Sequence, residues 1–569
     1  MPDVISVTPN HKSEVHTTHS WDFLGLDYNS QSNTLLQKGN YGEDIIIGVL
    51  DSGIWPESKS FDDTGYGPPP ARWKGICQTG DLFDASKINC SNKIIGARWY
   101  ASEYTSEELE GEFVSPRDKM GHGTHCASTA AGNLVSNASF HGLASGSVRG
   151  GAPRARLAIY KVCWVNLGCS TASILAAIDH AIDDGVDVIS MSIGGPVEYL
   201  GTLHAIVKGI PVVFAAGNNG PAPQSVQNNM PWVISVAAST MDRCDNSTLS
   251  KVNITNKIVL CYNPTAIATV LPRKNFNEAL TDVSNAGGRG LIYAQYTVNI
   301  PTQQDVPYAL VDFEIANEII SYISSTSNPL VKISPAYNIV GNHVLAPRVA
   351  AFSSRGPNPI FTGILKPDIA APGVSILAAK NEGYEFDSAT VVDTYGVQIK
   401  AEATPRKIAD PFDYGGGHID PNKIVDPGLI YDINPNDYTK FYNCTLGLSD
   451  ECDSYVDQQY QLNAPSIAIP NLKDIISVWR SVTNVGPYNS IYKAFVQPPA
   501  GVSVFVEPNL LSFDNNNKVK TFKVTFVANR KVQGDYTFGS LTWSDSLNHS
   551  VRIPLAIRTI IQNSYADTA

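Results

Sequence analysis

A histidine and an aspartate stand at positions from which they could act together on a proton. His122 lies between two glycines in residues 121–128, where a loop becomes a helix of small residues. Asp51 ends the apolar run 45–50 and is followed by Ser52-Gly53. A carboxylate fixes the tautomer of an imidazole and stabilises the imidazolium that forms when the ring takes a proton from a nucleophile. We therefore expect Asp51 and His122 to be two parts of a charge relay.

The elements that must position these side chains follow from hydrophobic patterning. Residues 45–50 are continuously apolar, which is typical of a strand buried on both faces. Residues 170–185 have helical periodicity, with Ser170 or Thr171 as the cap and Gly185 at the end. Further strands are expected at 157–162, 186–192 and 211–215, and a short helix at 200–207. This alternation predicts an α/β fold, a doubly wound parallel sheet with helices on both faces.

Two turns that follow predicted strands carry further candidate site residues. Ser192, Ile193 and Gly194 leave one strand with small residues, so an extended peptide could pair with their backbone. Asn218 follows another strand and holds a side-chain amide that could donate to an oxyanion. Taken singly, each is more simply a glycine or asparagine turn. Both lie at the carboxyl edge of the predicted sheet, where ligands bind in such folds.

A metal site is the weaker interpretation of the histidines. His122 and His125 are spaced i, i+3, whereas a zinc-protease helix needs histidines at i, i+4 with a glutamate beside the first. His180, on the predicted helix 170–185, is expected to be a solvated or capping residue. We therefore expect neither a metal nor a cofactor.

Composition excludes several classes of partner. The 41 basic and 53 acidic residues give a formal net charge of −12, which argues against a nucleic-acid or anionic-membrane surface. The longest apolar runs are far shorter than the ~20 residues that span a bilayer. No nucleic acid and no membrane span are expected.

Cysteines and sequons indicate an oxidising compartment. The nine cysteines fall into couples at 77 and 90, 163 and 169, 244 and 261, and 444 and 452, with Cys126 left over. Reduced cysteines or metal ligands are alternatives, but no couple has C-x-x-C spacing. Six N-x-S/T sequons fit a glycosylated secretory protein, although sequons also arise by chance. The first residues carry no signal-peptide pattern.

These motifs together make the chain similar to the plant subtilisin-like serine proteases, the subtilases. The resemblance runs almost end to end and rests on residues 16–26, 51–58, 117–118, 121–125, 218, 352–358, 366–374, 411–418 and 426–432. It implies that Asp51 and His122 are the relay acid and base, that Asn218 is the oxyanion donor, and that 192–194 bind substrate. It also implies polypeptide substrates and an extracellular location in the apoplast or cell wall.

The resemblance supplies a domain map. Residues 1–16 resemble the end of a propeptide, and residues 17–243 and 338–455 a subtilisin-like catalytic domain. Residues 244–337 resemble an inserted protease-associated domain whose start is truncated, with strands at 257–261 and 290–294 and a helix near 315–323. Residues 463–560 resemble a fibronectin-III-like β-sandwich, and the alternation of Phe522, Val524 and Phe526 with polar residues supports this independently.

The nucleophile is where this chain departs from the family. Subtilases carry it in a Gly-Thr-Ser block between the stretches matching 366–374 and 411–418, and no Gly-Thr-Ser occurs in this chain. Ser375 belongs to an apolar strand-like run, and Ser388 aligns with the segment beyond the nucleophile helix. We interpret the catalytic domain as internally deleted near 375–410. The deletion is expected to uncover strands such as 45–50 and 211–214.

Three hypotheses follow. An active endopeptidase would need an unorthodox serine, and loss of the nucleophile costs on the order of a million-fold in turnover. A catalytically dead peptide-binding protein would keep the cleft and the accessory domains. A truncated gene product explains the missing leader, the clipped insert and the missing nucleophile together, and ranks first.

Overall fold

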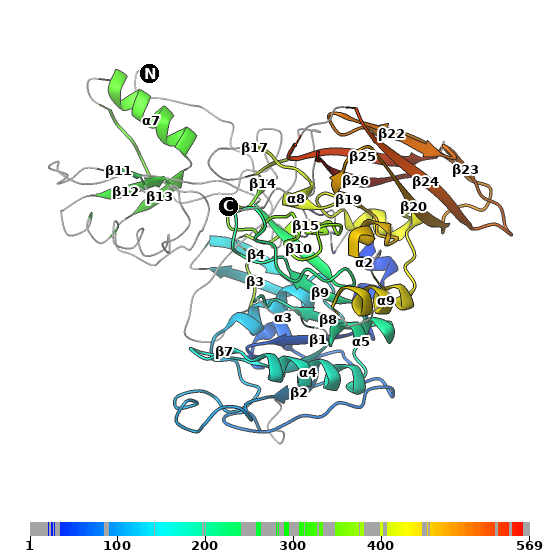
Figure 1. Ribbon diagram of the computed structural model, residues 1–569. Helices are drawn as coiled ribbons and strands as arrows, with labels where there is room; N and C mark the ends of the chain where they lie inside the picture. The colour runs from blue at the N-terminus through cyan, green and yellow to red at the C-terminus, as the bar shows by residue number, and fades with distance from the viewer. Residues whose placement is uncertain are drawn as a thin grey trace.

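A computed structural model places most of the chain (Figure 1). It describes residues 21, 24, 26, 28, 35–84, 90–140, 143–195, 199, 201–240, 258–262, 280, 283, 289–294, 307–311, 313–326, 329–333, 348–374, 376–379, 399–401, 407–446, 452, 456–529, 533–545 and 549–561. Ser375 and Ser388, the two serines considered for the nucleophile in the sequence analysis, lie outside these residues.

The centre of the molecule is a largely parallel β-sheet. Within the described residues its strand order is β17-β16-β14-β10-β9-β8-β1-β5-β2, with β15 also pairing with β10. Its parallel strands are β1 (Ile46–Asp51), β2 (Ile94–Trp99), β5 (Arg156–Lys161), β8 (Val188–Met191), β9 (Val212–Ala215), β10 (Ile234–Thr240) and β15 (Ile369–Pro372). The chain adds β2 and β5 on one side of β1 and β8 to β10 on the other. The direction of winding therefore reverses at β1, whose carboxyl end carries Asp51.

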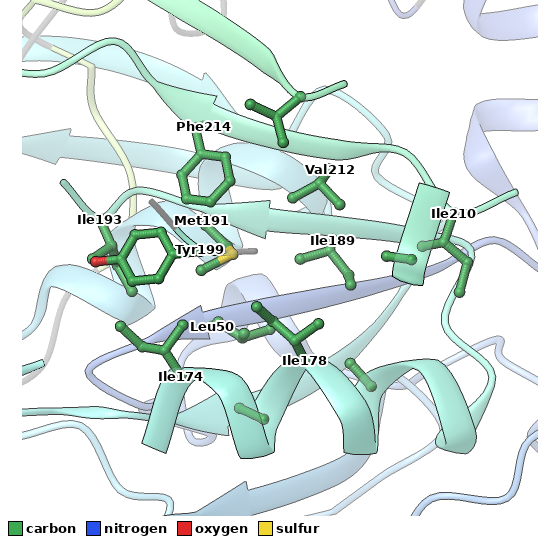
Figure 2. Close-up of a cluster of buried hydrophobic side chains, with 14 of the residues drawn as sticks. Leu50, Ile174, Ile178, Ile189, Met191, Ile193, Tyr199, Ile210, Val212 and Phe214 are labelled. Atoms are coloured by element: carbon green, nitrogen blue, oxygen red, sulfur yellow. The ribbon is translucent and has the colours of Figure 1, made fainter. Parts of the chain in front are cut away.

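Helices cover this sheet as the sequence predicts. The main ones are α3 (His122–Ala131), α4 (Thr171–Asp184) and α5 (Thr202–Val207). Ser170 precedes α4 and Gly185 ends it in the left-handed conformation, with a φ of 91°. Figure 2 shows Ile174 and Ile178 of α4 facing Leu50, Ile189 and Val212 of the sheet. The α/β architecture is thus confirmed, and the predicted helix 170–185 matches α4 within one residue at each end.

The sheet face on which α3 packs, opposite to α4, is covered unevenly. All six residues of β1 are buried, because α3 packs over one face and α4 over the other. Further along the sheet, the side chains in line with Val49 are only partly buried or exposed. They are Val188 and Ser190 of β8, Val213 and Ala215 of β9, Ile234 and Val236 of β10, and Ile369 and Ala371 of β15.

This pattern corrects one sequence-based expectation. The expectation that the deletion uncovers strand 45–50 is wrong for β1 itself, where only Ile45, just before the strand, is exposed, at 40%. In strand 211–214, Val212 and Phe214 are buried and Val213 is partly buried, and the deletion itself stays a prediction. We refer to the open stripe over β8, β9, β10 and β15 as the uncovered face.

Two further β-rich units accompany the central sheet. A three-stranded parallel sheet orders β11 (Ile258–Tyr262), β12 (Gly290–Ala294) and β13 (Tyr308–Val311), with helix α7 (Phe313–Ser325) following. These strands match the predictions at 257–261 and 290–294, and α7 matches the predicted helix. In Figure 1 this unit stands to one side of the central sheet, and the C-terminal strands stand on the other.

The C-terminal unit is a two-sheet β-sandwich. One sheet orders β18-β20-β24-β22 and the other β19-β26-β25-β21-β23. Their bounds are β18 (Leu429–Ile430), β19 (Ile467–Leu472), β20 (Ile475–Asn484), β21 (Ile491–Gln497), β22 (Val502–Glu507), β23 (Leu510–Ser512), β24 (Val519–Ala528), β25 (Tyr536–Ser544) and β26 (Ser550–Thr559). Phe522, Val524 and Phe526 are fully buried between the sheets, as their alternation predicts.

Short elements complete the described chain. They are α2 (Leu35–Lys38), α8 (Pro411–Tyr414), α9 (Pro435–Thr445), β3 (Val135–Phe140), β4 (Leu143–Val148), β6 (Cys163–Trp164), β7 (Gly168–Cys169), β14 (Arg348–Val349), β16 (Lys400–Ala401), β17 (Lys407–Ile408) and 3₁₀ turns at Asn40–Gly42, Lys59–Phe61, Pro421–Val425 and Val456–Gln461. Among the placed helices, none has the length and apolarity that a bilayer crossing requires.

Disulfides join three of the predicted cysteine couples. They are Cys77–Cys90, Cys163–Cys169 and Cys444–Cys452, and Cys126 is free. The fourth predicted couple, Cys244 with Cys261, falls partly outside the described residues because Cys244 is not placed.

Candidate active site

The structure brings Asp51 and His122 into direct contact. Asp51 is the last residue of β1 and His122 the first of α3, so the sheet edge and the helix start meet here. His122 Nδ1 lies 2.7 Å from Asp51 Oδ1, and this oxygen also accepts a hydrogen bond from the Ser52 amide at 2.7 Å. Asp51 is 2% exposed, whereas half of the His122 side chain, 52%, is open to solvent. The pair has the geometry of a carboxylate that orients an imidazole.

The buried carboxylate sets the electrostatics of the imidazole. The Asp51 charge raises the pKa of His122 above its ordinary value, and the Cys126 thiolate would raise it further. Burial of Asp51 strengthens this attraction, while solvent on the exposed side of the ring screens part of it. The arrangement therefore favours the imidazolium, which is the form that a relay base reaches after it takes a proton.

A second buried aspartate holds the start of α3. Asp118 is fully buried and accepts hydrogen bonds from the Gly121 amide, the Thr124 amide and the Thr124 hydroxyl at 2.7, 2.9 and 2.6 Å. The Ser52 hydroxyl donates to Asp118 Oδ1, the oxygen that also accepts from the Gly121 amide, at 2.9 Å. Asp118 thus satisfies the unpaired donors of the helix N-terminus and ties them to the end of β1.

Glycine is required beside His122 because two backbones approach closely. A Cβ on Gly123 would lie 2.4 Å from the Gly53 carbonyl oxygen, and a Cβ on Gly53 would lie 2.4 Å from that of Pro116. Gly53 also has a φ of 113°, which side chains rarely adopt. Larger residues at either position would push α3 away from β1 and separate the imidazole from its carboxylate.

The predicted peptide-binding segment lies at the end of β8, next to β1. Ser192 and Gly194 are exposed, while the Ile193 side chain is 7% exposed and joins the core that Figure 2 shows. This alternation leaves a strand-like backbone edge accessible. A Cβ on Gly194 would lie 2.1 Å from Gln227 Oε1, so a side chain there would have to displace the Gln227 amide.

Asn218 lies in the turn after β9 and is exposed. The turn is held from behind by Ser354, whose hydroxyl accepts a hydrogen bond from the Asn219 amide at 2.9 Å and whose amide donates to the Gly217 carbonyl at 3.0 Å. Because β9 follows β8 in the parallel sheet, Asn218 and 192–194 leave the same sheet edge. No measured contact joins Asn218 to His122.

Sequence reasoning missed Asn228, which connects the two strand ends. Its side-chain amide donates to the Ile193 carbonyl at 3.0 Å and to the Ala215 carbonyl at 2.8 Å. The side chain is 4% exposed and its φ of 56° is left-handed. The asparagine pair at 228–229 after a proline-rich turn was the available signal, but its partners lie 35 and 13 residues away.

His125, the second histidine of the i, i+3 pair, contacts a different part of the chain. His125 Nε2 lies 2.8 Å from the Ile376 carbonyl oxygen, so this ring faces the segment after β15. Cys126, one turn after His122, lies instead beside the relay pair, with its Sγ 3.8 Å from His122 Nδ1. The sequence analysis left Cys126 over from the cysteine couples but gave it no place at the site.

No serine completes the relay in the part of the chain that the structure describes. None of the placed serine hydroxyls is hydrogen-bonded to His122, whose recorded polar partners are Asp51 and Cys126. Ser353 and Ser354 instead bond backbone groups of β10 and of the Asn218 turn.

Comparison with known proteins assigns the chain to a family. The profile of the subtilase family matches residues 42–403, and that of a fibronectin type-III domain matches 461–557. Subtilisin-like protease SBT3.10 of Arabidopsis thaliana is 40% identical over 678 residues, covering 100% of this chain and 88% of the relative. Subtilisin-like proteases SBT3.8 and SBT3.16 of the same plant are 39% and 41% identical, over 100% and 99% of this chain and 88% and 86% of their own lengths. The chain is therefore a member of the subtilase family, in its plant subtilisin-like protease branch.

Proposed function

We propose that this protein binds polypeptides in the cleft of a subtilisin-like protease without hydrolysing them. Asp51 and His122 have the roles of relay acid and base, Asn218 that of oxyanion donor, and Ser192, Ile193 and Gly194 that of the peptide-pairing strand. The observation that carries the proposal is the Asp51–His122 pair with no serine hydroxyl bonded to the imidazole among the described residues.

The uncovered face supports the loss of a helix. In doubly wound α/β folds both sheet faces are covered, and β1 meets that rule. On the sheet face where α3 packs against β1, the side chains of β8, β9 and β10 that are in line with Val49 are only partly buried or exposed, so these strands do not meet the rule. The family's nucleophile begins a helix that packs inside this domain, and its absence would leave such a stripe.

The lengths of the alignments support an internal deletion. The alignment with SBT3.10 extends over 678 residues although this chain has 569, so at least 109 aligned positions are filled only in the relative. We place this deletion near residues 375–410 and at the start of the insert. The proposed boundaries remain a propeptide end at 1–16, a catalytic domain at 17–243 and 338–455, a protease-associated domain at 244–337 and a fibronectin-III-like domain at 463–560.

Serine labelling tests the absence of hydrolysis. Incubation with a fluorophosphonate probe and with a quenched peptide library should give neither covalent label nor turnover, because the imidazole has no hydroxyl to activate. Labelling of the chain that disappears in His122→Ala would overturn the proposal.

Peptide binding is tested separately. A fluorescent peptide library should raise anisotropy with the full chain, and Gly194→Val should reduce that binding, because a side chain there collides with Gln227. Gly67→Val serves as the matched control, because Gly67 is exposed, has open space around its Cβ position and does not have a positive φ. Equal binding by both variants would show that the cleft is not used.

A truncated gene product, the hypothesis ranked first from the sequence alone, is the alternative explanation of the same gaps. Sequencing the transcript across codons 374–411 decides between them: an intact Gly-Thr-Ser block would make this chain a truncated product of an active endopeptidase. The extracellular location follows the family resemblance, and secretion of a tagged chain into the apoplast would test it.

A further inference from the structure

Three different metal-binding side chains converge at the relay pair. Among the placed residues, Asp51, His122 and Cys126 offer one ligand atom each within 4.8 Å of one another. His122 Nδ1 is 2.7 Å from Asp51 Oδ1 and 3.8 Å from Cys126 Sγ. Zinc bonds are about 2.0–2.1 Å to nitrogen, about 2.0–2.2 Å to oxygen and about 2.3 Å to sulfur. One ion between the three atoms would therefore reach all of them with small rotations of the side chains.

The same carboxylate has a second oxygen that is unsatisfied. Asp51 Oδ1 already accepts two hydrogen bonds, but its Oδ2 is buried and has no hydrogen-bond partner. A buried carboxylate oxygen without a donor is costly and calls for an explanation such as an ion. The thiol has only weak neighbours, the His122 ring and the Ser192 hydroxyl. The cluster thus combines an orphan oxygen with a thiol that a cation would engage strongly.

The chemistry of the three ligands selects the cation. Calcium and magnesium prefer sets of oxygen ligands, whereas a thiolate with an imidazole suits zinc and its softer congeners. Three protein ligands leave the fourth zinc position for water, and the 52% exposure of the His122 side chain provides a path from solvent. Among the cysteines whose side chains the structure describes, Cys126 alone is free, so none of the others there offers a second thiol.

We infer that Asp51, His122 and Cys126 form a binding site for one Zn²⁺ ion. Binding releases the thiol proton of Cys126 and the Nδ1 proton of the His122 imidazolium, so that the ring binds the metal through Nδ1 and keeps one proton on Nε2. The ion and the Asp51–His122 hydrogen bond are mutually exclusive. The inference does not depend on whether the chain hydrolyses or binds peptides, because it concerns the ion alone.

Metal titration of the full chain is the test. We expect calorimetry to report one equivalent of Zn²⁺, and Cd²⁺, used as a spectroscopic probe, to produce a thiolate-to-metal absorption band in the ultraviolet. Cys126→Ser and His122→Ala should each weaken Zn²⁺ binding about 100-fold or more, since even the outer partners of metal ligands are worth 10–100-fold. His180→Gln, an exposed histidine bonded to Tyr100, is the matched control and should bind like the parent chain.

Alkylation gives a readout that needs no folded variant. Zn²⁺ should slow the reaction of iodoacetamide with Cys126, followed by peptide mapping, whereas Ca²⁺ should not. Zn²⁺ binding that survives in Cys126→Ser, a Cd²⁺ complex without the absorption band, or alkylation of Cys126 at an unchanged rate would each overturn the site.

Discussion

The hydroxyl of Ser52 donates a hydrogen bond of 2.9 Å to Asp118 Oδ1, and this bond fastens the end of β1 to the start of α3. The same hydroxyl accepts from the Gly123 amide at 2.8 Å. His122 stands between these contacts, so the position of the imidazole depends on side chains that never touch it.

Asp118→Ala should destabilise the chain by roughly 2–4 kcal/mol, because it leaves buried donors of Thr124, Gly121 and Ser52 without an acceptor. Urea unfolding followed by circular dichroism measures this. Asp183→Asn, exposed on α4, is the control and should change stability by less than about 0.5 kcal/mol. Equal midpoints for the two variants would contradict the role given to Asp118.

Asn228→Asp should loosen the two strand ends that lead into the cleft. The substitution keeps the shape and the tolerance for positive φ but removes both donated hydrogen bonds, to Ile193 and Ala215. We expect a loss of about 1–3 kcal/mol in unfolding free energy and weaker binding of peptides.

Gln224→Glu is the matched control for that experiment. Gln224 is exposed, has a φ of 58° and undergoes the same change from amide to acid. If both variants lose the same stability, the effect comes from the added charge and not from the loss of the hydrogen bonds that Asn228 donates to Ile193 and Ala215.

Peptide mapping of the non-reduced protein should find Cys77 joined to Cys90 and Cys163 to Cys169, with Cys126 free. Loops of 13 and 6 residues contribute roughly 2–3 kcal/mol each. Replacing Cys77 and Cys90 together by serine should therefore lower the melting temperature measurably. A peptide linking Cys126 to any of the other four would refute this pairing.

The contact between the segment before β18 and the β-sandwich should weaken as the pH rises. His549 Nδ1 lies 2.6 Å from Asp545 and its Nε2 lies 3.1 Å from Asp426, which precedes β18. The hydrogen bond to Asp545 raises the pKa of His549, with a further increase from Asp426 against the effect of burial. The charged His549 therefore stabilises the folded state fully below about pH 6.5, the ordinary pKa of histidine. This stabilisation is lost as the pH rises through the raised pKa of His549 in the folded chain.

Melting curves of the parent chain and His549→Asn at pH 5.5 and 9 check this sign. The free energy of unfolding should differ between the two chains by on the order of 0.5–1 kcal/mol at pH 5.5, a small value because Asp426 is largely solvated. This difference should shrink at pH 9. A difference that grows with pH would contradict the assignment.

Local patterns predicted the parts of this structure whose cause is local. The apolar run at 45–50 forms β1, and the alternation around Phe522 forms a strand of the sandwich. Ser170 and Gly185 flank the two ends of α4. Asp51 and His122 were found because their flanking residues form sharp turns at the ends of regular elements. Their contact across 71 positions follows from the winding of the sheet.

The remaining site residues depend on contacts that leave no local pattern. Asn228 matters because two carbonyls from separate strands point at it, and Ser354 because a turn 135 positions earlier rests on its hydroxyl. Cys126 comes beside the imidazole only because one helical turn separates them, which the residue spacing allowed but the sequence analysis did not use.

The uncovered face has a consequence for how the chain behaves at high concentration. Val213, Ile234 and Val236 offer apolar side chains to water in a row across neighbouring strands. Such a surface favours self-association and binds environment-sensitive dyes, and it does so in the folded molecule. We therefore expect the folded chain to bind such dyes and to self-associate as its concentration rises, even where its core is fully formed.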